Sequence, residues 1–257
     1  MSFERVVRRL GASGNYLIFT VGDSITEGLR ASNDETTYTA VFAQHLANRY
    51  LQKSVFRYDG KRYDSPDGEL LPLERFDGAH VVQSGTAGKI TVVRCGIGGN
   101  TAGRLLLRRS DFIGREIDGK CADLFVICVG INDSLRNDPS KYTPVKEYRK
   151  NLCLLLNEIE AGAPDADVIF MTPTYNDTGL SAESTVDAYA EAMIGVAKDR
   201  DIPVVDLHKL WMEHLTVGGE CYGQGDWLCG RLGDCCHPSD LGHAEIAAEM
   251  IRCIFGE

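Results

Sequence analysis

Short apolar runs alternate along the chain with stretches that repeat apolar residues at helical spacing. Five runs have the length and composition of strands buried on both faces, at residues 16–21, 90–94, 123–129, 167–172 and 203–206. Helical patterns lie between or after them, at residues 37–50, 101–109, 144–161, 182–199 and 239–255. Alternating strands and helices predict a five-stranded parallel sheet wrapped by crossover helices, in a three-layer α/β/α fold.

The segment 53–89 interrupts this alternation. It is rich in Gly, Asp, Arg and Tyr, and the turn signal Asp59-Gly60 predicts a hairpin insertion. A linker to a second domain is the alternative, but the segment is too short and too polar to form a core of its own. Residues 1–257 are therefore expected to form one domain, and the insertion to serve as a lid or as a contact in a homodimer.

The charge balance limits the partners of the chain. With 27 Lys and Arg against 37 Asp and Glu, the net charge is −10, which repels nucleic acid and anionic membranes. The first ten residues include Glu4, Arg5, Arg8 and Arg9, where a signal peptide would have an apolar stretch. We expect no nucleic-acid or membrane partner and a cytoplasmic location. Nine cysteines, an odd number, make a secreted disulfide framework improbable.

Two predicted strands end in segments with reactive potential. In open α/β sheets, reactive groups gather at the carboxyl ends of the strands. Residues 22–28 (GDSITEG) place Ser24 at a strand-to-helix turn, although Asp23 and Ser24 also suit a simple helix N-cap. The glycine-rich segment 96–101 exposes backbone N–H groups. It has neither the Lys-Ser/Thr of a phosphate-binding loop nor the spacing of a dinucleotide fingerprint.

Two further segments complete this pattern. Asn132 follows the third strand, where its amide is either a donor into the crevice or part of an Asx-turn. Asp234 precedes His237 by three residues, a spacing that suits a structural ion pair or a carboxylate that accepts from Nδ1–H and leaves Nε2 free as a base. Serine, glycine amides, an amide side chain and an Asp/His pair together make up the inventory for acyl transfer.

In this order, the four segments resemble the four blocks of the SGNH (GDSL) hydrolase family. The matching residues are Gly22-Asp23-Ser24, Gly98-Gly99-Asn100-Thr101, Gly130-Ile131-Asn132-Asp133 and Asp234-Cys235-Cys236-His237. The resemblance implies a flavodoxin-like fold with Ser24 as nucleophile, His237 as general base and Asp234 as the group that orients His237.

The resemblance also implies an oxyanion hole. Its donors would be the N–H groups of Ser24 and Gly99 and the side-chain amide of Asn132, with Gly98 as the alternative to Gly99. One departure from the family is Arg94, which stands where the second block often has an asparagine five residues before the glycine donor.

The implied activity is that of a serine esterase without cofactor or metal. Members of this family without a leader often act on short acyl esters, including O-acetyl groups on sugars, so a carbohydrate or other small-molecule ester is the expected substrate. Asp23, Gly98, Tyr175 and Trp227 are the expected substrate contacts, the aromatic rings for stacking on sugars. The alternatives are a thioesterase or lysophospholipase with the same triad, and a catalytically silent carbohydrate-binding domain.

Other side chains have simpler interpretations. The spacing of the cysteines near His237 does not fit a zinc site and favours free thiols, with one disulfide between the first two as an option; they are Cys221, Cys229, Cys235 and Cys236. Three arginines on the helix after the glycine segment predict a solvated face, or less readily a contact to an acidic substrate; they are Arg104, Arg108 and Arg109. His243 is expected to pack inside the last helix.

Overall fold

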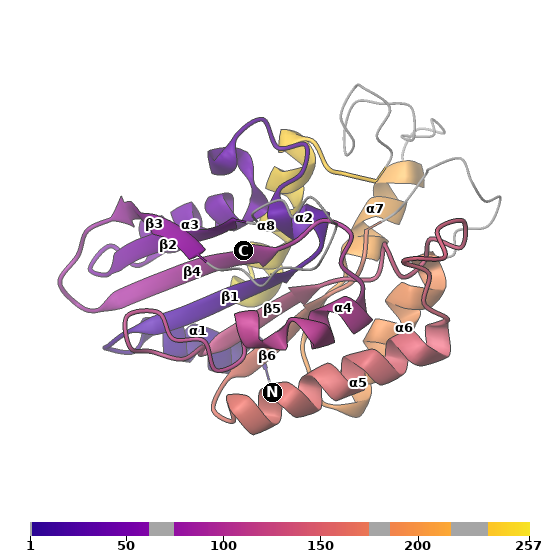
Figure 1. Cartoon of the computed structure of the whole chain (residues 1–257). Helices are drawn as coiled ribbons and strands as arrows, with labels where there is room; N and C mark the ends of the chain where they lie inside the picture. The colour runs from indigo at the N-terminus through magenta and orange to yellow at the C-terminus, as the bar shows by residue number, and fades with distance from the viewer. Residues whose placement is uncertain (1, 62–74, 175–185, 217–235) are drawn as a thin grey trace.

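The computed structural model describes residues 2–61, 75–174, 186–216 and 236–257 (Figure 1). In these residues, seven strands form one sheet with the spatial order β3-β2-β4-β1-β5-β6-β7. Their bounds are β1 (Tyr16–Gly22), β2 (Ser54–Lys61), β3 (Arg75–Gln83), β4 (Lys89–Gly96), β5 (Leu124–Cys128), β6 (Asp167–Met171) and β7 (Val204–Val205). Neighbouring strands pair in parallel, except that β2 and β3 are antiparallel.

Helices cover both faces of the sheet. One face carries α1 (Phe3–Gly11), α3 (Tyr38–Arg49), α7 (Leu207–Thr216) and α8 (Asp240–Phe255). The other face carries α4 (Ala102–Leu107), α5 (Val145–Gly162) and α6 (Val186–Asp199). Figure 1 shows α3 and α8 on one side of the strands and α4, α5 and α6 on the other. One further helical turn, α2 (Ser24–Glu27), follows β1, and short 3₁₀ turns lie at Asp34–Thr36 and Arg109–Asp111.

The two hydrophobic cores follow from the alternation of side chains along the strands. In β1, Leu17 and Phe19 face the core under α4 to α6, whereas Ile18 faces the core under α3 and α8. Every residue of β1 is buried, as expected of a central parallel strand. Phe19 packs on Phe125 of the neighbouring strand with ring centroids 6.1 Å apart. Full burial of such a side chain stabilises the fold by about 2–3 kcal/mol.

The three-layer α/β/α architecture is confirmed, but the count of five strands is wrong. The predicted strands correspond to β1, β4, β5, β6 and β7, and the insertion adds β2 and β3 to the same sheet. The turn predicted at Asp59-Gly60 is also wrong, because β2 runs through both residues and pairs with β4. Asp59 is a buried ion-pair partner of Arg57 and Arg94 instead of a turn residue. The antiparallel pairing of β2 with β3 agrees with a hairpin, whose connection, 62–74, lies outside the described residues.

The charged N-terminal segment forms a helix that the apolar pattern did not predict. Ser2 caps α1 by accepting the N–H of Arg5. Near the other end of α1, Arg9 donates to Asp123 at 3.0 Å and to Asp167 at 2.7 Å, where β5 and β6 begin. Helix α7 was not predicted either. None of the helices in the described part of the chain combines the length and the apolar character needed to cross a bilayer.

Candidate active site

The turn after β1 presents Ser24 as the first residue of α2. Asp23 caps this helical turn, because its Oδ1 accepts the N–H of Ile25 at 3.0 Å. The turn lies so close to β4 that a Cβ on Gly96 would come within 2.1 Å of the Glu27 nitrogen, which explains the glycine at that position. The Asp-Ser pair therefore caps a helix and places a serine hydroxyl beyond the end of the strand.

The imidazole of His237 meets this hydroxyl. Oγ of Ser24 lies 2.8 Å from Nε2 of His237, within hydrogen-bond reach of a nucleophile and its base. His237 precedes α8, whose N-cap Ser239 accepts the N–H of Gly242. The other ring nitrogen, Nδ1, lies 3.4 Å from the Sγ of Cys236. The structure thus joins two residues that are 213 positions apart in the sequence.

The glycine loop after β4 has its two candidate donors in different situations. The Gly98 N–H donates to Oε2 of Glu27 at 2.6 Å and is therefore occupied. Gly99 has a φ of +77°, a conformation that favours glycine, and its N–H has no acceptor among the described residues. Of the two alternatives, the geometry favours Gly99 as a donor to a substrate oxygen.

Asn132 adds a side-chain donor from the loop after β5. Its Nδ2 donates to the carbonyl of Asn100 at 2.9 Å, which fixes the amide and leaves its second N–H for another acceptor. Asn100 in turn donates to the carbonyl of Gly22 at 3.0 Å. Hydrogen bonds therefore tie together the loops that carry the serine, the glycines and the amide.

These residues line a cavity of about 240 Å³. Its polar groups include those of Ser24, Asn132 and His237, and much of its wall is apolar. The cavity is lined by Ser24, Ile25, Leu29, Gly98, Gly99, Ile131, Asn132, Leu135, Lys141, Cys236 and His237. Lys141 brings a positive charge to this cavity and forms an ion pair with Asp138 at 3.0 Å.

Two buried carboxyls lie behind the site. Burial raises the pKa of Asp23 to about 7 and that of Asp133 to about 7 as well. Asp133 accepts the N–H of Ala102, the first residue of α4, at 3.1 Å. Asp23 is 1% exposed and is not among the residues that line the cavity, so in this structure it acts as a helix cap. Its predicted contact with substrate stays a prediction.

Several predicted residues lie outside the described part of the chain. They are Asp234, Tyr175, Trp227, Cys221, Cys229 and Cys235. Their roles therefore stay predictions. Cys236 contacts the imidazole of His237, and among the described residues no group of three or more His, Cys, Asp or Glu is placed to hold a metal ion.

The arginines after the glycine loop differ from the predicted solvated face. Arg104 donates to the carbonyl of Gly99 at 2.9 Å. Arg108 is buried and donates to the carbonyl of Cys95, and only Arg109 forms an exposed ion pair, with Glu158. The helical pattern predicted one helix for these residues, whereas α4 ends at Leu107, and it gave no signal that the first two side chains turn back toward the strand end and its loop.

Sequence reasoning also missed Glu27 and Lys141. Glu27 lies three residues after Ser24, one helical turn along, and this spacing was a signal that the two residues share a face. Lys141 reaches the cavity from a loop after β5, and no local pattern marks it. His243 is buried as expected, its ring stacked on Tyr38 with centroids 6.2 Å apart.

Comparison with solved structures shows the same fold in several esterases. The acetylxylan esterase Axe2 from Geobacillus stearothermophilus is similar over 95% of this chain and 96% of its own, with a TM-score of 0.64 and 24% identity. The acetyl xylan esterase AlAXEase covers 91% of this chain and 97% of its own, with a TM-score of 0.61 and 20% identity. A two-domain esterase (CEX) active on acetylated mannans covers 99% of this chain and 53% of its own, with a TM-score of 0.64 and 16% identity.

Comparison with sequences gives one match to a family model. No curated protein matches the chain. The model of the GDSL-like Lipase/Acylhydrolase family matches residues 73–245, about two thirds of the chain. This range includes the loops of Gly99 and Asn132 and also His237, and the hydrogen bond from His237 to Ser24 connects it to the serine turn that precedes it. From the matched range, the shared fold and the order of its four motifs, we conclude that this chain belongs to the GDSL-like lipase/acylhydrolase family.

Proposed function

We propose that this protein is a serine esterase that removes short acyl groups, acetyl above all, from carbohydrate. The observation that carries the proposal is the 2.8 Å contact between Ser24 Oγ and His237 Nε2 in a cavity that Gly99 and Asn132 also line. A nucleophile, a base and amide donors in one cavity are the parts that acyl transfer requires.

In the first half of the reaction, Ser24 Oγ attacks the ester carbonyl while His237 Nε2 takes its proton. Negative charge develops on the carbonyl oxygen, and the N–H groups of Ser24 and Gly99 and the amide of Asn132 stabilise it. His237 then gives its proton to the leaving sugar hydroxyl, and the acyl group stays on Ser24. Each such amide donor is worth about 10²- to 10³-fold in turnover.

In the second half, His237 takes a proton from water as the water attacks the acyl-enzyme carbonyl, and then gives this proton to Ser24 Oγ as the carboxylic acid leaves. Asp234 is the residue proposed to hold the imidazole by accepting from Nδ1–H. Serine, histidine and amide groups supply every step of this scheme, so it uses no metal or cofactor.

Support for a short acyl group comes from the cavity. Its volume of about 240 Å³ is small, and Leu29, Ile131 and Leu135 give it an apolar wall beside the nucleophile. Support for a carbohydrate comes from the similar structures, which include esterases of acetylated xylan and mannan. Tyr175 and Trp227 are the aromatic residues proposed to stack on the sugar.

The test is hydrolysis of p-nitrophenyl acetate, butyrate and octanoate by the wild type, Ser24→Ala and the exposed-serine control Ser110→Ala. We expect turnover that is greatest on acetate, lost in Ser24→Ala and unchanged in Ser110→Ala. Acetate released from acetylated xylooligosaccharides, followed by NMR, then tests the carbohydrate.

Other outcomes would identify another function. Activity that increases steadily from acetate to octanoate would contradict the short-acyl assignment and favour a lysophospholipase or thioesterase. Failure to hydrolyse any ester or to react with a fluorophosphonate, together with binding to glycans, would favour a carbohydrate-binding domain.

The proposal takes residues 1–257 as a single hydrolase domain and the segment 53–89 as a lid or a contact in a homodimer. The position of β3 at an edge of the sheet supports a contact, because an edge strand presents unpaired backbone groups. Light scattering at several protein concentrations measures the oligomeric state. The cytoplasmic location stays a prediction from the sequence.

A further inference from the structure

Two charged side chains hold the glycine loop at 97–100 and take no part in the mechanism above. Glu27 contacts the loop through the N–H of Gly98, and Arg104 contacts it through the carbonyl of Gly99. The two residues belong to different elements, α2 and α4, which follow β1 and β4 in the chain. The loop is therefore held at two successive residues by partners of opposite charge.

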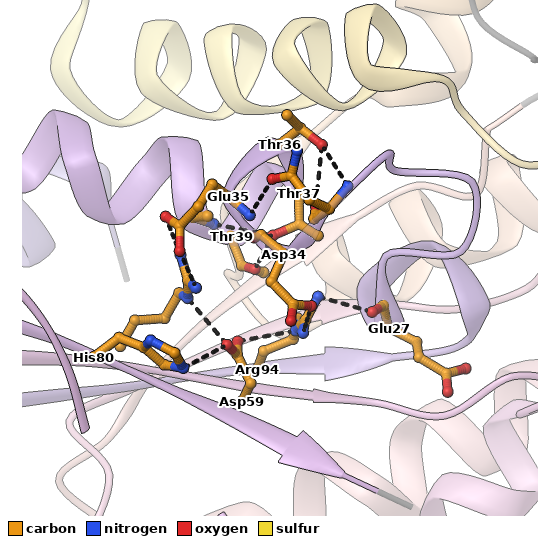
Figure 2. A network of polar contacts seen from close by, with 12 residues as sticks. Glu27, Asp34, Glu35, Thr36, Thr37, Thr39, Asp59, His80 and Arg94 are labelled. Carbon is orange, nitrogen blue, oxygen red and sulfur yellow. Dashed lines mark hydrogen bonds and ion pairs between the residues drawn. The ribbon is translucent and has the colours of Figure 1, made fainter. Parts of the chain in front are cut away.

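The contact of Glu27 is short and firmly supported. Its Oε2 lies 2.6 Å from the Gly98 nitrogen, the distance of a charge-assisted hydrogen bond. The backbone of Glu27 is fixed as well, because Arg94 Nη1 donates to its carbonyl at 3.0 Å (Figure 2). Arg94 is 6% exposed and is held by ion pairs with Asp34 at 2.5 Å and Asp59 at 3.0 Å. The Glu27 carboxylate thus extends from a backbone that Arg94 holds in place.

The contact of Arg104 joins two loops. Its Nη1 donates to the Gly99 carbonyl at 2.9 Å, and its Nη2 donates to the Ser140 carbonyl at 3.2 Å. Thr101 caps the helical turn by accepting the N–H of Arg104 at 3.2 Å. A guanidinium can make both bonds at once because its donors are fixed in one plane. Arg104 therefore fixes the carbonyl side of Gly99 and, with it, the orientation of that residue.

Between these two contacts lies the peptide bond from Gly98 to Gly99, whose N–H is the proposed oxyanion donor. Two glycines in sequence impose little restraint on the rotation of this peptide. We propose that Glu27 and Arg104 are positioning residues that hold this peptide so that the Gly99 N–H, and not that of Gly98, points to the reacting oxygen. The inference rests on the proposed function, because it assigns a structural cause to the oxyanion hole invoked there.

Substitutions of Glu27 can separate the effect of its negative charge from the effect of its hydrogen bond to the Gly98 N–H. A Cβ on Gly98 would lie 3.0 Å from Glu27 Oε2 and 3.7 Å from the Cβ of Ser24, so the carboxylate lies close to the nucleophile. A negative charge there opposes the oxyanion, and the benefit of Glu27 must come from its hydrogen bond. Glutamine keeps an acceptor oxygen without the charge, whereas alanine has no acceptor and aspartate is too short to keep the 2.6 Å contact.

The experiment measures kcat and KM for p-nitrophenyl acetate in Glu27→Gln, Glu27→Ala, Glu27→Asp and Arg104→Met. Arg109→Met, which removes an exposed arginine next to the same helix, is the matched control. We expect kcat to fall about 10- to 100-fold in Glu27→Ala, Glu27→Asp and Arg104→Met, with KM within about twofold of the wild type. Glu27→Gln should restore kcat to within about fivefold of the wild type.

A boronic acid provides a readout that a merely structural role would not change. Phenylboronic acid accepts Ser24 Oγ at boron while His237 takes the proton, and the tetrahedral anion that forms occupies the oxyanion site. Its dissociation constant should rise in each variant by the same factor as kcat falls. Circular dichroism checks folding, and Glu27→Asp and Arg104→Met test the proposal should Glu27→Ala fail to fold.

The outcomes distinguish this inference from the proposed function. Wild-type turnover with kcat unchanged in Glu27→Asp and Arg104→Met would overturn the inference and leave the esterase assignment standing. A loss in Glu27→Gln as large as in Glu27→Ala, or a loss of boronic acid binding that does not follow kcat, would also overturn it. Absence of turnover in the wild type would instead overturn the proposed function.

Discussion

Replacing Asp23 with asparagine would remove a buried carboxyl next to the nucleophile and keep its hydrogen bond. The Asp23 side chain accepts the N–H of Ile25, and asparagine is an equally good N-cap. Burial, with a smaller contribution from the nearby charge of Asp133, raises the pKa of Asp23 to about 7. Asp23→Asn therefore removes the cost of burying a carboxylate and keeps the hydrogen bond that caps the helix.

The sign of the effect follows from the direction of the pKa shift. The unfolded carboxyl has a pKa of about 3.8, so between pH 4 and 7 the folded state binds the proton more tightly. The stability that protonated Asp23 contributes is fully present below about pH 4 and is lost as the pH rises through 7. About three pKa units at about 1.4 kcal/mol each amount to about 4 kcal/mol. Relative to Asp23→Asn, the wild type should lose about this much between pH 4 and 8.

The assay is urea unfolding of the wild type and Asp23→Asn at several pH values, with a reductant present because the chain has nine cysteines. Asp133→Asn is measured beside them, because Asp133 titrates in the same pH range. Asp165→Asn, on the surface, is the matched control and should follow the wild type. Free energies of unfolding that stay parallel from pH 4 to 8 in the wild type and Asp23→Asn would refute the reasoning.

Three further predictions test other parts of the structure. Burial lowers the pKa of His243 to about 4, so the stability that the neutral imidazole contributes is lost as the pH falls from 6.5 to 4. Over this pH range, the free energy of unfolding should fall by about 3 kcal/mol less in His243→Gln than in the wild type. Gly99→Ala should reduce kcat about 100-fold, because φ at this residue is +77° and the new Cβ would lie 3.3 Å from Arg104. Gly98→Ala should reduce kcat less, because its φ is not in the left-handed region and its Cβ would meet Glu27 Oε2 at 3.0 Å and Ser24 Cβ at 3.7 Å. Arg94→Met should lower the free energy of unfolding by about 3 kcal/mol in urea titrations, since buried Asp59 loses one of its two arginine partners, and adding Asp59→Asn should restore part of the loss.

Sequence reasoning located the core of the sheet because its strands are apolar on both faces. Each of the five predicted strands overlaps an observed one, since a short and wholly apolar run such as residues 124–128 suits a strand buried on both faces. The sequence predicted a hairpin in the insertion but not that its strands join this sheet, for the opposite reason. Arg57 and Asp59 point into the protein as an ion pair, so β2 has charged residues where the apolar pattern expects hydrophobic ones.

The site was predictable to the extent that its residues belong to short local motifs. Ser24, Asn132 and His237 each follow a strand or precede a helix, and topology brings the ends of these elements together. Choosing between Gly98 and Gly99 required knowing which of the two N–H groups already has an acceptor. The acceptor of the Gly98 N–H is Glu27, which comes from another strand end. The turn of Arg104 toward Gly99 likewise depends on a side-chain rotamer, about which residue spacing contains no information.

Arg94 shows how the insertion and the site depend on one another. It stands where the resemblance expected an asparagine, and a guanidinium in that buried place needs carboxylates around it. Asp59 from β2 supplies one, and Asp34, which precedes α3, supplies another (Figure 2). The third guanidinium nitrogen of Arg94, Nη1, donates to the carbonyl of Glu27, the residue that holds the Gly98 N–H. Because Asp59 reaches Arg94 only if β2 pairs with β4, the insertion strand helps to fix the end of the nucleophile turn.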